Sequence, residues 1–119
     1  MKEIFVFTTD TVGQHSKGAA KVAYKKHGAR WGMAYGQYGN SFAIPVKNQD
    51  GQYIKESYID GFVEGFINYA AINPQWDFHL HSTERLDPYQ FINATGNILF
   101  PEEWRRYLGD TYNYWGEIK

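Results

Sequence analysis

The sequence contains no cysteine. This absence excludes disulfide bonds, thiolate zinc sites and a thiol nucleophile, and it fits a protein of a reducing compartment. The net charge is also small, at −1, because 12 lysines and arginines stand against 13 aspartates and glutamates. Without a basic surplus the chain lacks the attraction that supports non-specific binding to nucleic acid. We therefore expect no nucleic-acid partner, and base stacking on aromatic side chains is the weakest of the binding hypotheses.

Long hydrophobic runs are absent as well. The apolar run at residues 4–7 is shorter than the roughly 7–15 residues of a secretory signal core or the roughly 20 of a membrane-spanning helix. We expect no membrane association and a cytoplasmic location. The length of 119 residues and the hydrophobic content of 43% fit one ordered domain with one core.

Aromatic residues, by contrast, are abundant, with four Trp, ten Tyr and eight Phe. The Phe residues fall mainly in segments that we predict as strands and as an amphipathic helix, so we assign them to the core. The Tyr and Trp residues concentrate in residues 31–39 and 104–115. Because these side chains combine a large apolar ring with a polar group, they are common at binding surfaces. The sequence therefore predicts two candidate surfaces.

Strand-like and helix-like segments alternate along the chain. Apolar residues recur at helical spacing in residues 56–71, which form the clearest amphipathic helix. A second helix is predicted over residues 17–28, with Ser16 as its N-cap and small residues facing the sheet. Pro45 is expected to end the second strand. The predicted strands are residues 3–8, 41–45, 76–81 and 98–100, with a helical turn at 88–91 and a short helix from 101. This alternation predicts an α/β domain in which helices flank a mixed sheet.

We predict a single domain over residues 1–108 and an aromatic C-terminal tail over residues 109–119. The tail has too few aliphatic residues for a core of its own, so it either packs on the domain or serves for binding. Tyr, Trp and Arg commonly anchor protein interfaces. The candidate protein-binding residues are Arg105, Tyr107, Tyr112, Tyr114 and Trp115.

The polar segment TTDTVGQHSKG, residues 8–18, joins the first strand to the first helix. Free backbone N–H groups and the positive dipole end at a helix N-terminus favour a phosphate or another anion. Gly13 and Gly18 would let the backbone approach a ligand. Asp10 could accept hydrogen bonds from a ribose or a base, and His15 could act as an acid or base. The pattern matches neither the Walker A motif nor the dinucleotide fingerprint, so an ordinary strand–helix turn remains the alternative.

A second loop, residues 32–40, interleaves glycines with aromatic residues. Aromatic faces beside exposed amides could stack a base and hold a phosphate. The alternative is that these aromatic residues pack over the end of the core while the glycines make tight turns.

Two further histidines, His79 and His81, share one face of the predicted third strand. Such a pair could bind a metal ion, but the sequence offers no third ligand at motif spacing. We predict a solvated or internally bonded pair, with no metal site and no cofactor. His27, near a helix end, is expected to interact favourably with the helix dipole.

Three segments carry a resemblance to a known family: HSKGAA at residues 15–20, GNSFAIP at residues 39–45 and LFPEEW at residues 99–104. Through them, residues 3–107 resemble the macro-domain-like proteins of phages and bacteria, many of unassigned function. The resemblance implies a small macro-like α/β fold with a cleft for ADP-ribose or a related nucleotide. The chain differs from the family pattern at residues 81–88, where Glu84 and Asp87 bring bulk and negative charge in place of a glycine-rich loop.

From the resemblance and the two loops, we predict a phage-type macro-like domain with a modified cleft that binds ADP-ribose or a related nucleotide. Enzymatic activity stays open, with binding alone favoured; any remaining catalysis would use Asp10 to orient the ligand and His15 as acid or base. The alternative is an inhibitor that binds a host defence or metabolic protein in the host cytoplasm and keeps the fold without catalysis. The predicted ligand-binding residues are Thr9, Asp10, Gly13, His15, Gly18, Ala19, Gly36, Tyr38, Gly39, Asn40 and Ser41.

Overall fold

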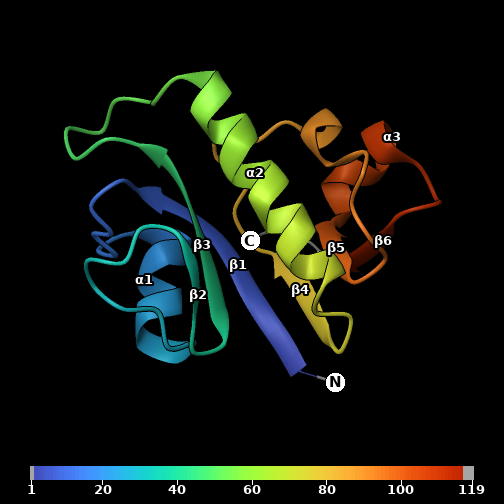
Figure 1. Ribbon diagram of the computed structural model, residues 1–119, viewed down its shortest axis with the longest axis horizontal. Helices are drawn as coiled ribbons and strands as arrows, with labels where there is room; N and C mark the ends of the chain where they lie inside the picture. The colour runs from blue at the N-terminus through green and yellow to red at the C-terminus, as the bar shows by residue number, and fades with distance from the viewer. Residues whose placement is uncertain (1, 117–119) are drawn as a thin grey trace.

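The computed structural model describes residues 2–116, which form a six-stranded mixed sheet and three helices (Figure 1). The strands are β1 (Lys2–Asp10), β2 (Gly36–Tyr38), β3 (Ser41–Lys47), β4 (Trp76–Leu80), β5 (Ile98–Pro101) and β6 (Asn113–Gly116). The helices are α1 (Gly18–Lys26), α2 (Glu56–Ala71) and α3 (Arg105–Leu108), with 3-10 turns η1 (Pro88–Phe91) and η2 (Glu102–Trp104). None of the helices within the described residues combines the length and apolar character that crossing a membrane requires.

The strand order is β2-β3-β1-β4-β5-β6. All neighbouring pairs are parallel except β2 and β3, which are antiparallel. The parallel strands, counted along the chain, follow the order 2-1-3-4-5, which is one of the doubly wound arrangements. The chain passes from β1 through α1 to β3 and then back past β1 through α2 to β4, so the connections reverse direction at β1. Doubly wound domains bind ligands at the carboxyl ends of the strands beside this reversal.

The side chains of β1 alternate between two apolar clusters. Ile4 and Val6 are fully buried in the larger cluster, which contains the apolar side of α2 as well as residues of η1 and η2. Phe5 and Phe7 belong to a smaller cluster on the opposite face, with four alanines from α1, β3 and the loop after α1. The small residues predicted on α1 are therefore confirmed to face the sheet. In the described part of the chain, α1 is the one helix in this second cluster, so the same face at β4, β5 and β6 has no helix packed on it.

The predicted elements agree closely with the structure where the sequence pattern is periodic. Helix α2 has the predicted bounds, and the strands predicted at residues 3–8, 76–81 and 98–100 are confirmed to within two residues. The prediction that Pro45 ends the second strand is wrong, because β3 continues to Lys47. Strand β2 pairs only with the first three residues of β3, Ser41 to Ala43, so Pro45 lies beyond the end of β2. At that position one edge of β3 has no partner strand among the described residues, and the missing N–H group of proline is tolerated there. Strand β2 itself falls in a segment that we predict as a loop.

The aromatic tail contributes the sixth strand of the sheet. Asn113–Gly116 pairs in parallel with β5, and two tyrosine hydroxyls, one from the residue before the strand and one from within it, donate to backbone carbonyl oxygens. Tyr112 donates to Ile92 and Tyr114 donates to Gly109, each at 2.7 Å. Residues 117–119 of the predicted tail lie outside the described residues.

Candidate functional site

A cleft of about 440 Å³ lies at the carboxyl ends of β1, β3 and β4. It is bordered by the N-terminus of α1, by the turn after β3 and by the segment after β4. The lining residues are Thr8, Thr9, Asp10, Gln14, Ser16, Lys17, Gly18, Ala19, Ala20, Lys47, Asn48, Gln49, Gly51, Ser82 and Glu84. The cleft thus occupies the place where doubly wound domains bind ligands, and its volume falls within the usual range of small-molecule pockets.

Asp10 holds the loop that follows β1. Its side chain is buried, and Oδ1 accepts hydrogen bonds from the backbone N–H groups of Val12 at 3.1 Å and Gln14 at 3.0 Å. A carboxylate that accepts two backbone bonds fixes the local conformation in the manner of an Asx turn. Asp10 therefore lines the cleft, while one of its oxygens is already engaged by the loop.

His15 lies behind the cleft and not in it. It is 1% exposed, and Nε2 lies 2.9 Å from the carbonyl oxygen of Arg30. Since a carbonyl oxygen only accepts, Nε2 carries the proton, and Nδ1 accepts from the hydroxyl of Thr9 at 3.1 Å. Both ring nitrogens are occupied in this arrangement, so neither is free for a ligand.

Gly13 supports the same loop from behind. Its φ is +70°, and a Cβ atom added there would lie 2.5 Å from the backbone nitrogen of Met33. The backbone N–H of Gly32 donates to the carbonyl of Gly13 at 2.9 Å. Gly13 is therefore required for the close packing of two loops, and not for the approach of a ligand to the backbone that the sequence predicts.

The N-terminus of α1 opens on the cleft without a side-chain cap. The N-cap residue is Lys17, so the predicted capping by Ser16 is wrong. No acidic residue occupies the first turn of the helix. The backbone N–H groups at Gly18 and Ala19 therefore have no side-chain acceptor and remain available to a ligand.

Charges of both signs line the cleft. Nζ of Lys47, at the end of β3, lies 3.3 Å from Oε1 of Glu84, in the segment after β4. The hydroxyls of Thr8 and Ser82 are hydrogen-bonded to each other and join β1 to the same segment. Because the carboxylate of Glu84 already pairs with Lys47, an anionic ligand would have to compete with Glu84 for this lysine.

The second predicted loop lies away from this cleft. Gly36 and Tyr38 belong to the edge strand β2, and Ser41 begins β3 at the amino end of that strand. Six residues of extended chain, about 20 Å, separate Ser41 from the end of β3 where the cleft lies. The turn at Gly39 and Asn40 packs instead against the end of α1, where the N–H of Asn40 donates to the carbonyl of His27 at 2.8 Å. The structure thus brings together Thr9, Asp10, Gly18 and Ala19, but not the residues of the second loop.

His79 and His81 lie on the face of β4 that has no helix packed on it. The structure adds a third side chain to the pair: Nδ1 of His79 lies 2.9 Å from Oε1 of Glu3, on the neighbouring strand β1. One ligand atom from each of these three residues lies within 4.8 Å of the other two. Glu3 is not predictable as a third ligand from the sequence, because only the parallel pairing of β1 with β4 brings it near the histidines, and no local spacing indicates that pairing.

The ring of His81 is held between two aromatic rings. Its centroid lies 4.1 Å from that of Phe5 and 4.1 Å from that of Trp115. Burial, followed by the neighbouring His79 and His27, lowers the pKa of His81 to about 4. His27 stacks on the other side of Phe5 at 4.2 Å, and burial also lowers the pKa of this residue.

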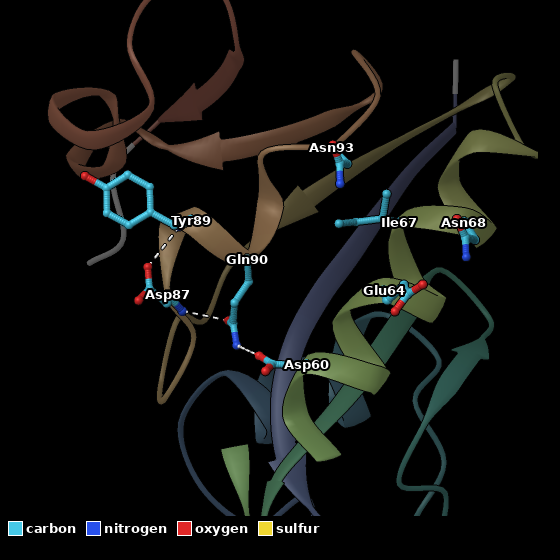
Figure 2. A pocket seen from close by; sticks show the side chains of 8 residues that line it. All are labelled: Asp60, Glu64, Ile67, Asn68, Asp87, Tyr89, Gln90 and Asn93. Atoms are coloured by element: carbon cyan, nitrogen blue, oxygen red, sulfur yellow. Dashed lines mark hydrogen bonds between the residues drawn. The ribbon is translucent and has the colours of Figure 1, made fainter. Parts of the chain in front are cut away.

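A larger hollow, of about 620 Å³, lies between α2 and η1 (Figure 2). Figure 2 shows Gln90 bridging two carboxyl-bearing residues: it donates to Asp60 at 2.6 Å and accepts from the backbone N–H of Asp87 at 2.8 Å. Glu64 contributes a third carboxylate, and none of the lining residues is basic. This surface repels phosphate, so the cleft at the carboxyl ends of the strands is the better site for an anion.

The residues predicted for protein binding divide into bonded and exposed side chains. Arg105 is paired with Glu102 and Asp110, and its guanidinium lies over the ring of Tyr114 at 4.3 Å. Trp115 is bonded to β4, whereas Tyr107 is 50% exposed.

Comparison of the chain with protein-family models, with curated proteins and with solved structures finds no match.

Proposed function

We propose that this protein is a binding module for ADP-ribose or a related phosphate-bearing nucleotide. The observation that supports the proposal is the cleft at the carboxyl ends of β1, β3 and β4, onto which the uncapped N-terminus of α1 opens. A phosphate at the helix N-terminus would accept hydrogen bonds from the first backbone N–H groups and meet the positive end of the helix dipole. Lys17 and Lys47 supply positive charge on the same lining.

Binding without turnover is the form of the proposal that the local contacts favour. Catalysis by His15 would need a free ring nitrogen within reach of the ligand, and both nitrogens of His15 are hydrogen-bonded inside the domain. Asp10 is engaged in shaping the loop. Both residues therefore act on the ligand through the conformation of residues 11–16.

A substitution at the N-cap separates ligand binding from stability. Lys17→Asp should stabilise the helix by about 1 kcal/mol, because a carboxylate at the N-cap accepts from the first-turn N–H groups. The same carboxylate should weaken binding of ADP-ribose, because it takes the place of the phosphate and reverses a charge. The expected result is a higher denaturation midpoint together with an affinity reduced about tenfold or more in titration calorimetry.

Lys21→Asp is the matched control, since it makes the same charge change one turn further along α1, at an exposed position. It should leave affinity nearly unchanged. The proposal fails if ADP-ribose, AMP and inorganic phosphate all give neither heat nor a thermal shift with the unmodified protein. It also fails if the two aspartate variants weaken binding equally.

A second candidate function is binding of a host protein, supported by the groove beside Tyr89 and Tyr107. These side chains are 61% and 50% exposed and border a groove of about 450 Å³ that also contains Arg85. Exposed tyrosines beside an arginine are typical anchors of protein interfaces.

The test is capture of a partner from host lysate with the double variant Tyr89→Ala, Tyr107→Ala. The control is Tyr24→Ala, which removes another exposed tyrosine, on α1. The interface is supported if the double variant loses capture while the unmodified protein and Tyr24→Ala keep it. Equal capture by the unmodified protein, the double variant and Tyr24→Ala excludes it.

A further inference from the structure

Glu3, His79 and His81 form a cluster of possible metal ligands away from the cleft. In the register of β1 with β4, Phe5 pairs with His79, which places all three cluster residues on the same face of the sheet. One ligand atom from each lies within 4.8 Å of the others, and the carboxylate of Glu3 already contacts Nδ1 of His79 at 2.9 Å. Two imidazoles and one carboxylate are a ligand set that proteins use for zinc.

The second observation is an unsatisfied nitrogen. Within residues 2–116, Nε2 of His81 is buried and has no hydrogen-bond partner. A buried polar atom without a partner costs free energy, and such atoms are rare in folded domains. Coordination to a metal ion would give this nitrogen the bond that the protein does not supply.

The ring of His81 is also oriented before any ion arrives. It is stacked at 18° on Phe5 and lies at 32° to the indole of Trp115. The ring of His79 is nearly parallel to that of His81, at 17°. Ligands whose rings are held in place by their neighbours lose little freedom on binding.

We propose that Glu3, His79 and His81 bind a Zn²⁺ ion, with the two imidazoles and the carboxylate as ligands and water in the fourth position. In tetrahedral zinc sites with bonds of about 2.0–2.2 Å, ligand atoms lie roughly 3.3–3.5 Å apart, so the three ligand atoms, which lie within 4.8 Å of one another, would move closer together on binding. Glu3 is the mobile member, because its side chain is 61% exposed. The same exposure gives the ion access from solvent.

This site is independent of the proposed nucleotide site. Glu3 and Asp10 lie toward opposite ends of β1, and seven residues of extended strand correspond to about 23 Å. Failure of one proposal therefore leaves the other intact.

The experiment uses the full chain, freed of any affinity tag and stripped of metal with a chelator. Titration calorimetry with Zn²⁺ should give one equivalent bound, and Zn²⁺ should raise the midpoint of thermal unfolding. Glu3→Gln should weaken Zn²⁺ binding by about tenfold or more, and because Glu3 is exposed this variant should fold normally. His27→Gln is the matched control, since it removes a histidine that stacks on Phe5 but is not one of the three ligands.

His81→Phe provides a second test, in which the stability of the metal-free protein should not fall although the stabilisation by Zn²⁺ is lost. Phenylalanine preserves the stack and removes the unpaired nitrogen, so the metal-free variant should be at least as stable as the unmodified protein. It should also lose the stabilisation by Zn²⁺. Absence of stoichiometric Zn²⁺ binding to the unmodified protein overturns the proposal, and so does binding that Glu3→Gln and His81→Phe leave at the level of His27→Gln.

Discussion

The indole N–H of Trp115 donates a hydrogen bond to the carbonyl oxygen of Leu80 at 2.8 Å. Trp115 lies on β6 and Leu80 on β4, so this bond crosses the intervening strand β5. The same indole lies against the ring of His81. Trp115 thus joins the sixth strand directly to β4.

Trp115→Ala should lower the free energy of unfolding by about 2–3 kcal/mol, because it removes a half-buried indole and leaves the Leu80 carbonyl without its partner. Trp115→Phe keeps the ring stack and should cost only about 1 kcal/mol. Denaturant unfolding measures both values. Tyr107→Ala, at an exposed side chain, should cost less than about 0.5 kcal/mol. A cost for Tyr107→Ala as large as that for Trp115→Ala would contradict the structural role of Trp115.

Gly13→Ala should destabilise the protein by more than about 2 kcal/mol. Its φ of +70° strains any L-residue, and the new Cβ would meet the backbone of Met33 at 2.5 Å. Gly51→Ala is the matched comparison, since its φ is +82° but no atom lies within 4 Å of the added Cβ. It should cost only about 1 kcal/mol, measured in the same denaturant series. Equal costs would mean that Met33 moves away freely.

Asp10→Ala should destabilise the loop at residues 11–16 and lower stability by about 1–3 kcal/mol, because the N–H groups of Val12 and Gln14 lose their acceptor. Asp10→Asn keeps an acceptor oxygen in the same place and should recover most of this loss. Hydrogen exchange at Val12 and Gln14, together with equilibrium unfolding, separates the two variants. Identical behaviour would show that the negative charge, and not the acceptor geometry, matters at this position.

Tyr35 should make stability sensitive to alkaline pH. Burial raises the pKa of Tyr35 above its usual value of 10.0, and its hydroxyl donates to the carbonyl of Phe62 at 2.8 Å. The unfolded chain therefore ionises first, and the contribution of Tyr35 is present below pH 10 and declines as the pH rises through the folded pKa. Tyr35→Phe should cost about 1 kcal/mol near neutral pH, and this difference should narrow as the pH rises above about 10. Denaturant unfolding at a series of pH values measures the difference in stability between the two proteins. A difference that stays constant would contradict the raised pKa of Tyr35 in the folded protein.

The elements that are predictable from the sequence are those with a local signal. The helix Glu56–Ala71 follows from apolar residues at helical spacing, and β1 follows from a continuous β-branched and aromatic run. Strand β2 has no such signal, because Gly36 and its neighbours form a strand only by pairing with β3. Strand β6 is likewise an aromatic segment that becomes a strand by pairing with β5.

The candidate site shows the same division. Asp10 and the start of α1 are predictable as site residues, because a polar segment between a strand and a helix indicates a strand–helix loop. The glycine-rich loop at residues 32–40 is not part of that cleft. It leads into the amino end of β3, and because β3 runs parallel to β1, that end lies opposite the carboxyl ends of the strands, where the cleft is.

By itself the sequence determines that this is one α/β domain without thiol chemistry, with a polar loop before its first helix. Composition and periodicity are sufficient for these conclusions because they depend on properties of single segments. Only the tertiary structure decides which loops share a cleft, that His15 is internally bonded, and that Glu3 lies beside His79 and His81. These relationships arise from strand order and register, which bring residues together across long stretches of chain, and no single segment carries that information.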